Sequence, residues 1–102
     1  MSLTHQVVQK LHGVSEPNSS RAHDLVDLQL IFARDAVDLK EVSRIAKRLF
    51  ANRRRQPWPT LITKGKSWDT LYADAAEGLE VLDSVDEAIA WANELIERID
   101  RA

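Results

Sequence analysis

Apolar residues recur along most of this chain at spacings of three and four, the period at which side chains share one face of an α-helix. The clearest case is the stretch from 85 to 99, where apolar positions follow the i, i+3, i+4, i+7 template almost throughout. A second clear stripe runs from 39 to 50. The sequence offers no hairpin signal and no alternating apolar and polar segment in competition with helices. The pattern therefore predicts an all-α protein.

Capping residues and turn residues divide this pattern into five predicted helices. The first covers about residues 4–11 and stops near Gly13, and residues 15–18 form a turn. The fourth ends near Gly78. A Ser or Asp followed three residues later by Glu is a capping box, which satisfies free N–H groups at a helix start. The expected N-terminal caps of the second to fifth helices are Ser19 or Ser20, Asp38 with Glu41, Ser67, and Ser84 with Glu87.

The stretch 53–66 interrupts the helical pattern. It contains two prolines and a glycine, so we expect an ordered but irregular loop there. Residues 60–63 are the one candidate for a short extended segment. The expected architecture is a compact bundle of about five helices with one long irregular loop (53–66), forming a single domain over residues 1–102.

Length and composition further limit the kinds of protein and of functional site that this chain can form. The 102 residues suffice for one modest hydrophobic core. Cysteine is absent, which excludes disulfides, thiolate nucleophiles and cysteine-ligated zinc and, without a leader-like segment, favours a cytoplasmic location. No apolar run approaches the roughly 20 residues that span a bilayer, so no membrane partner is expected.

Charge is strongly segregated along the chain. Residues 40–66 hold nine Lys or Arg against one acid, whereas residues 67–102 hold ten acids against two Arg. The two segments therefore carry net charges of +8 and −8. Either the halves attract each other within the molecule, or the basic half meets an anionic partner.

A cluster of polar residues opens the second predicted helix. His23, Asp24 and Asp27 are spaced so that their side chains converge on one side, with Arg21 close by. Two carboxylates beside a cation can hold a metal, position a nucleotide or act as a base. The alternative is an ordinary acidic helix start in which Arg21 pairs locally. His5, His12 and His23 have no metal-ligand spacing, so we expect no metal site from the histidines.

The third predicted helix carries basic side chains opposite its apolar stripe. Such a face could bind the phosphates of RNA or of a nucleotide, with Trp58 available to stack on a base. The alternative is a solvated outer face, with Trp58 packed between its two prolines. The candidate nucleotide- or RNA-binding residues on this helix are Lys40, Arg44, Lys47 and Arg48, followed by Arg53, Arg54 and Arg55.

Two motifs joined by a variable turn carry a resemblance to a known family. They are Gln9-Lys10-Leu11-His12-Gly13 and the stretch from Arg21 to Leu28, which reads R-A-H-D-L-V-D-L. They resemble the E-K-L-x-A and R-x-K-D-L-x-D-L motifs of the AbiEii/AbiGii-type nucleotidyltransferase toxins. The Gln56-Pro57-Trp58-Pro59 segment and the last helix are similar to the tail of that family. The resemblance spans nearly the whole chain.

The resemblance implies an active site formed by two domains. Members combine an N-terminal nucleotidyltransferase domain, whose carboxylates hold Mg²⁺, with a helical C-terminal part. By motif match, Lys10 and Asp24 complete the active site, with Asp27 and Arg21 in support. The lysine would neutralise triphosphate charge, and the aspartate would orient it or deprotonate the acceptor hydroxyl. This chain differs from the family pattern in having Gln9 and His23 where a glutamate and a lysine are usual.

We therefore expect a C-terminal domain or remnant of such an enzyme, without the N-terminal catalytic domain. Alone it should not transfer nucleotides and should need no cofactor; completed, it would use Mg²⁺ and a nucleoside triphosphate. The expected partners are a nucleotidyltransferase domain or an antitoxin protein, and an RNA such as tRNA. The alternative function is that of a non-catalytic helical protein-interaction module, whose acidic last helix docks a basic partner.

Overall fold

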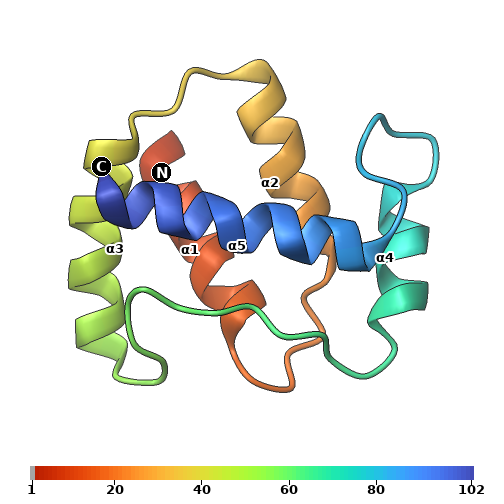
Figure 1. The fold of residues 1–102 in the computed structure, drawn as a ribbon, viewed down its shortest axis with the longest axis horizontal. Coiled ribbons are helices and arrows are strands. Elements are labelled where there is room, and N and C mark those ends of the chain that lie inside the picture. The colour runs from red at the N-terminus through yellow and green to blue at the C-terminus, as the bar shows by residue number, and fades with distance from the viewer. Residues whose placement is uncertain (1) are drawn as a thin grey trace.

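The computed structural model describes residues 2–102 and shows five α-helices packed around one core (Figure 1). The Cα atoms occupy about 33 × 29 × 24 Å. In chain order the helices are α1 (Leu3–Ser15), α2 (His23–Arg34), α3 (Leu39–Arg53), α4 (Trp68–Ala76) and α5 (Val85–Arg101). Residues 2–102 contain no β-strand. The predicted all-α bundle of about five helices is confirmed.

The first and the last helix contact different sets of neighbours in the bundle. α1 packs on α2 and α3, whereas α5 packs on α2, α3 and α4. Figure 1 shows α5 running across the molecule, with α3 at one of its ends and α4 at the other. The predicted apolar stripe of α5 is buried at Ala88, Ala92, Leu95, Ile96 and Ile99.

Two of the predicted N-cap residues are confirmed. The Asp38 side chain accepts hydrogen bonds from the backbone N–H groups of Lys40 and Glu41, and so begins α3. Ser84 Oγ accepts from the Glu87 N–H at 3.1 Å and donates to the Glu87 carboxylate at 3.1 Å. The side chains of Asp38 and Ser84 therefore supply partners for free N–H groups at both helix starts. In the described chain the return bond of a capping box is missing, because the Glu41 carboxylate accepts from Arg44 and the Glu87 carboxylate accepts from Ser84 Oγ.

The other boundaries differ from the predictions. α1 continues through Gly13 to Ser15, because the apolar face extends to the buried Val14. Ser19 and Ser20 do not cap α2: in the described chain its N-cap is Ala22, without a side-chain bond, and Ser19 Oγ instead accepts from the Arg21 N–H. Ser67 precedes α4 in a left-handed conformation (φ 65°), and within residues 2–102 its side chain caps nothing.

The irregular segment between α3 and α4 is ordered, as predicted, but residues 60–63 form no strand within the described chain. Ile62 is buried, and its N–H and C=O pair with the side-chain amide of Asn93 on α5 at 2.8 and 3.1 Å. The Asn93 side chain thus gives the Ile62 backbone the two hydrogen bonds that a neighbouring strand would supply in a sheet. Gln56 fixes the start of the loop by donating to the His12 carbonyl at 2.8 Å and to Ser15 Oγ at 2.9 Å.

None of the helices in residues 2–102 combines the length and the apolar character that crossing a membrane would require.

Candidate functional site

The packing of α1 on α2 brings together the residues that the sequence motifs single out. Lys10 lies on α1, and its Nζ is 2.9 Å from Asp27 Oδ2 and 3.6 Å from Asp24 Oδ1, both on α2. These partners are 17 and 14 residues away along the chain. Lys10 therefore bridges two carboxylates across the α1–α2 interface.

Asp24 is the buried centre of this cluster, since its side chain is fully shielded from solvent. Its Oδ2 accepts from Arg21 Nε at 2.8 Å. Its Oδ1 accepts no hydrogen bond in the described chain, but lies 3.4 Å from His23 Nε2. A buried carboxylate is stable only with such cationic partners, so Arg21 and Lys10 hold Asp24 in place. Asp27 is different, because 40% of its side chain is exposed.

Gly13 makes this arrangement possible, and the sequence motifs did not identify it as a site residue. A Cβ atom at position 13 would lie 2.9 Å from Arg21 Nε and 3.0 Å from Arg21 Cζ. The bare backbone of α1 therefore leaves room for the guanidinium to lie across it and reach Asp24. A buried glycine inside an amphipathic helix is the sequence signal for such a close approach.

A shallow pocket of about 340 Å³ opens beside the cluster, lined by Gln6, Gln9, Lys10 and Arg21. The lining supplies two cations and two amides. Amides and cations are the groups that bind phosphate oxygens. The two basic side chains, Lys10 and Arg21, pair with the two acidic ones, Asp24 and Asp27.

The cluster fits a magnesium ion poorly. Donor atoms of His23, Asp24 and Asp27 lie within 4.8 Å of one another, which is a possible ligand spacing. Lys10 already contacts both carboxylates, however, and Arg21 contacts that of Asp24, whereas Mg²⁺ needs near-octahedral oxygen ligands. A divalent cation would have to displace the ammonium group of Lys10 against charge repulsion.

The candidate nucleic-acid residues on α3 are all exposed, but they do not act as one surface. Arg44 is tied to Glu41 one turn away. Arg48 lines a groove of about 270 Å³ with His5, Leu49 and Arg53. Lys47 lines a different hollow, beside Trp58. Lys40 contacts no acid in the part of the chain that the structure describes.

Trp58, predicted as a possible stacking platform, packs within the protein. Its ring lies edge-on to Phe50 with centroids 5.2 Å apart, and Phe50 in turn meets the ring of His12 at 4.9 Å. The side chain is half-buried. The packing interpretation of Trp58 therefore describes the structure better than the stacking one.

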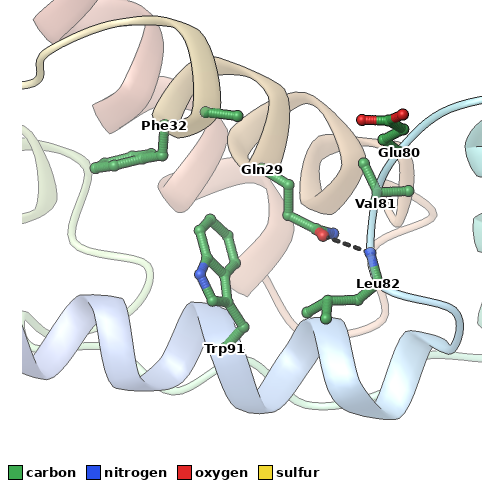
Figure 2. A pocket seen from close by; sticks show the side chains of 7 residues that line it. Gln29, Phe32, Glu80, Val81, Leu82 and Trp91 are labelled. Atoms are coloured by element: carbon green, nitrogen blue, oxygen red, sulfur yellow. Dashed lines mark hydrogen bonds between the residues drawn. The ribbon is translucent and has the colours of Figure 1, made fainter.

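A larger, mainly apolar groove of about 550 Å³ lies between α2, α5 and the segment that joins α4 to α5. Figure 2 shows Phe32 and Trp91 at one end, and Glu80, Val81 and Leu82 at the other. The Phe32 and Trp91 rings meet edge to face at 6.1 Å. Neither ring belongs to a site predicted from the sequence.

No protein-family model matches the chain, and no curated protein matches it in sequence.

Proposed function

We propose that this chain supplies the lysine and aspartate of a nucleotidyltransferase active site that another domain or chain completes. The observation that carries the proposal is the contact between Lys10 and the two aspartates of α2. The motif resemblance requires these residues to meet, and they do so although they lie on different helices. The pocket beside Lys10 provides a place for phosphate groups.

The geometry supports a separate role for each residue. Lys10 and Arg21, at the pocket, bind oxygens of the triphosphate and neutralise charge that develops during transfer. Asp24 is buried and held by Arg21, so it acts as a positioning residue for Lys10. Asp27 is exposed enough to reach a hydroxyl, and becomes the candidate proton acceptor once the phosphates draw Lys10 away from it.

The RNA that accepts the nucleotide would meet the exposed basic residues of α3, with tRNA as the expected class of partner. Arg48 and Lys47 are better placed than Arg44, whose guanidinium is already neutralised by Glu41. Phosphate contacts of this kind weaken steeply with salt. Under this proposal Mg²⁺ enters with the nucleotide and the completing domain.

The decisive experiment is calorimetric titration of the chain with each Mg²⁺-bound nucleoside triphosphate. We expect binding that Lys10→Ala or Arg21→Ala weakens by about tenfold or more, because each removes a charged hydrogen bond to phosphate. Lys66→Ala and Arg34→Ala are the matched controls, since both are exposed, lie outside the pocket and should bind like the wild type. Equal binding by Lys10→Ala and wild type would refute the site assignment.

A second titration, with tRNA at two salt concentrations, tests the proposed binding of the acceptor RNA to the basic residues of α3. We expect Arg48→Ala to reduce affinity and salt sensitivity more than Arg44→Ala does. Activity is then sought by adding an AbiEii-type nucleotidyltransferase domain on a separate chain. Transfer of nucleotide to RNA that disappears with Lys10→Ala would support the full proposal.

The apolar groove supports a second candidate, a non-catalytic interaction module. Large apolar side chains of α2 and α5 line an open groove, and such surfaces bind protein segments. In that case the chain binds no nucleotide, and the Lys10–Asp24–Asp27 cluster only joins α1 to α2. Loss of stability in Lys10→Ala without any change in ligand binding would favour this candidate.

A further inference from the structure

The groove of about 270 Å³ between the start of α1 and α3 has an apolar floor and a basic rim. Ile45 and Leu49 form the floor, since Ile45 is buried and Leu49 packs partly against the core. Four exposed polar side chains form the rim, namely His5, Arg48, Asn52 and Arg53. Among the described residues, no acid lines this groove.

Helical spacing puts the floor and most of the rim on one face of α3. Positions 45, 48, 49, 52 and 53 recur at intervals of three and four, so their side chains are neighbours. α1 packs on α3 and contributes His5 to the opposite side (Figure 1). The fold therefore brings two guanidinium groups, an amide and an imidazole to one opening.

The two guanidinium groups of this groove lack acidic partners. Within residues 2–102, neither Arg48 nor Arg53 forms an ion pair with a carboxylate, whereas Arg44 on the same helix pairs with Glu41. Arg53 Nη1 lies 3.5 Å from Nδ1 of His12, which is a ring nitrogen and not an acid. Both positive charges of the groove are therefore available to an anion.

The charge of the groove favours a doubly charged ligand. Arg48 and Arg53 contribute two positive charges, and the Asn52 amide adds a further donor. A phosphate monoester carries a charge of about −1.5 to −2 near pH 7, and its three terminal oxygens can accept from both guanidinium groups. A carboxylate, with a single charge, would leave one guanidinium unpaired.

The size and the floor of the groove restrict what the phosphate is attached to. Its 270 Å³ lies just below the range of about 300–1,000 Å³ that is usual for ligand pockets, so the ligand must be small. Ile45 and Leu49 would contact an apolar or aromatic body beside the phosphate. The backbone of an RNA strand fits less well, because its phosphates are singly charged diesters.

We propose that this groove binds a small phosphate monoester, with Arg48 and Arg53 holding the phosphate and with Ile45 and Leu49 contacting an apolar or aromatic body. The site is separate from the one proposed at Lys10, because Lys10 contacts α2 whereas the groove faces α3. The inference therefore goes beyond the nucleotidyltransferase proposal and does not depend on it.

The test is calorimetric titration of the full chain with phenyl phosphate at low salt. We expect binding that Arg48→Ala and Arg53→Ala each weaken by about tenfold or more, because each removes a charged hydrogen bond to the phosphate. Lys47→Ala, at an exposed position of the same helix outside the groove, is the matched control. Lys10→Ala should also bind like the wild type, so failure of this proposal and failure of the nucleotide proposal give different results.

Two further probes separate the contributions of charge and body. Inorganic phosphate lacks the apolar body, and benzoate lacks the second charge, so both should bind more weakly than phenyl phosphate. Circular dichroism checks that each variant is folded.

His12 provides a second readout, which reports on Arg53 directly. Burial, and then the positive charge of Arg53, lower the pKa of His12. A dianion bound to Arg53 offsets that charge, so NMR titration of the His12 ring should give a higher pKa with saturating phenyl phosphate than without it. Glu16 and Arg55 also act on His12, but they pair with each other outside the groove and should contribute equally to both titrations.

Three results would overturn the proposal. One is the absence of phenyl phosphate binding at low salt. Another is binding that Arg53→Ala leaves unchanged, or a His12 pKa that is the same with and without ligand, since either would place the ligand elsewhere. The third uses short RNA oligonucleotides, whose 5′ ends can carry the same group. Binding of a 5′-phosphorylated strand, but not of its 5′-hydroxyl form or of phenyl phosphate, would assign the groove to RNA ends instead of small molecules.

Discussion

At the scale of single residues, burial decides which charged groups between α1 and α2 can change partner. Asp24 is fully buried and bonded to Arg21, so breaking that pair would leave an uncompensated charge in the interior. Asp27 is partly exposed, and water can replace Lys10 as its partner. The ion pair between Lys10 and Asp27 is therefore the one that can break when a ligand binds, whereas the pair between Arg21 and Asp24 stays in place.

His12 provides a prediction at the same scale. Burial, and then the nearby positive charge of Arg53, lower the pKa of His12 from its usual 6.5. The unfolded chain therefore binds a proton more readily than the folded one between these two pKa values. We expect the contribution of His12 to the free energy of unfolding to be constant above this range and to fall as pH drops below 6.5 towards the folded pKa.

The measurement is urea unfolding between about pH 7.5 and about pH 5.5, where the slope cannot exceed about 1.4 kcal/mol per pH unit from one group. His12→Gln should flatten the profile, whereas the exposed His5→Gln should leave it unchanged. An identical slope in wild type and His12→Gln would exclude His12 as its source.

Sequence motifs pointed to Lys10 and Asp24, but could not place them in contact. Their distance depends on how α1 packs on α2, and helical periodicity says only which face is apolar. The role of Gly13 does not follow from the motifs either, because a glycine after an apolar stripe predicts the end of a helix. The structure shows that its missing Cβ makes space for the Arg21 guanidinium.

At the scale of elements, prediction succeeded where local chemistry fixes the boundary. Asp38 and Ser84 bond to N–H groups within three residues of themselves, so the sequence contains the whole interaction. The starts of α2 and α4 have no such side-chain cap in the described chain. A contact between distant residues instead joins the start of α4 to the segment before α2. Trp68 Nε1 donates to the Ser19 carbonyl at 2.6 Å.

The loop between α3 and α4 gives a prediction for a whole element. Asn93 holds it to α5 through two hydrogen bonds to Ile62, whose side chain is buried. Asn93→Ala removes both bonds, so we expect the free energy of unfolding to fall by about 1–3 kcal/mol. The Ile62 amide should also exchange its hydrogen much faster.

Chemical denaturation and amide exchange measured by NMR test this expectation. Glu94→Ala, at the exposed neighbouring position, should change neither quantity. Unchanged protection of the Ile62 amide in Asn93→Ala would show that the loop is held by packing alone.

At the scale of the whole molecule, the opposite charges of the two halves remain largely unpaired. Within residues 2–102, the ion pairs that join the segments 40–66 and 67–102 all come from Lys64, to Asp69 at 2.9 Å and Asp86 at 3.4 Å. Other basic residues find partners elsewhere, as Arg55 does with Glu16. The charge segregation therefore leaves most of both surfaces available to partners of opposite charge.

The hydrophobic core, by contrast, connects all five helices, and this predicts cooperative unfolding. Ile96 is 1% exposed, in the middle of the helix that contacts α2, α3 and α4. Ile96→Ala should therefore lower the free energy of unfolding by about 2–5 kcal/mol, the range for large-to-small changes in a core. Ile89→Ala, on the half-buried edge of the same helix, should have a smaller effect.

The two probes for this prediction report on different parts of the molecule. Fluorescence follows Trp58 in the loop, Trp68 in α4 and Trp91 in α5, whereas far-ultraviolet circular dichroism follows all helices. Because a single core joins them, both transitions should coincide in wild type and shift together in Ile96→Ala. Separate midpoints for fluorescence and circular dichroism would mean that α4 and α5 unfold apart from α1 and α3, and that the chain has two cooperative units.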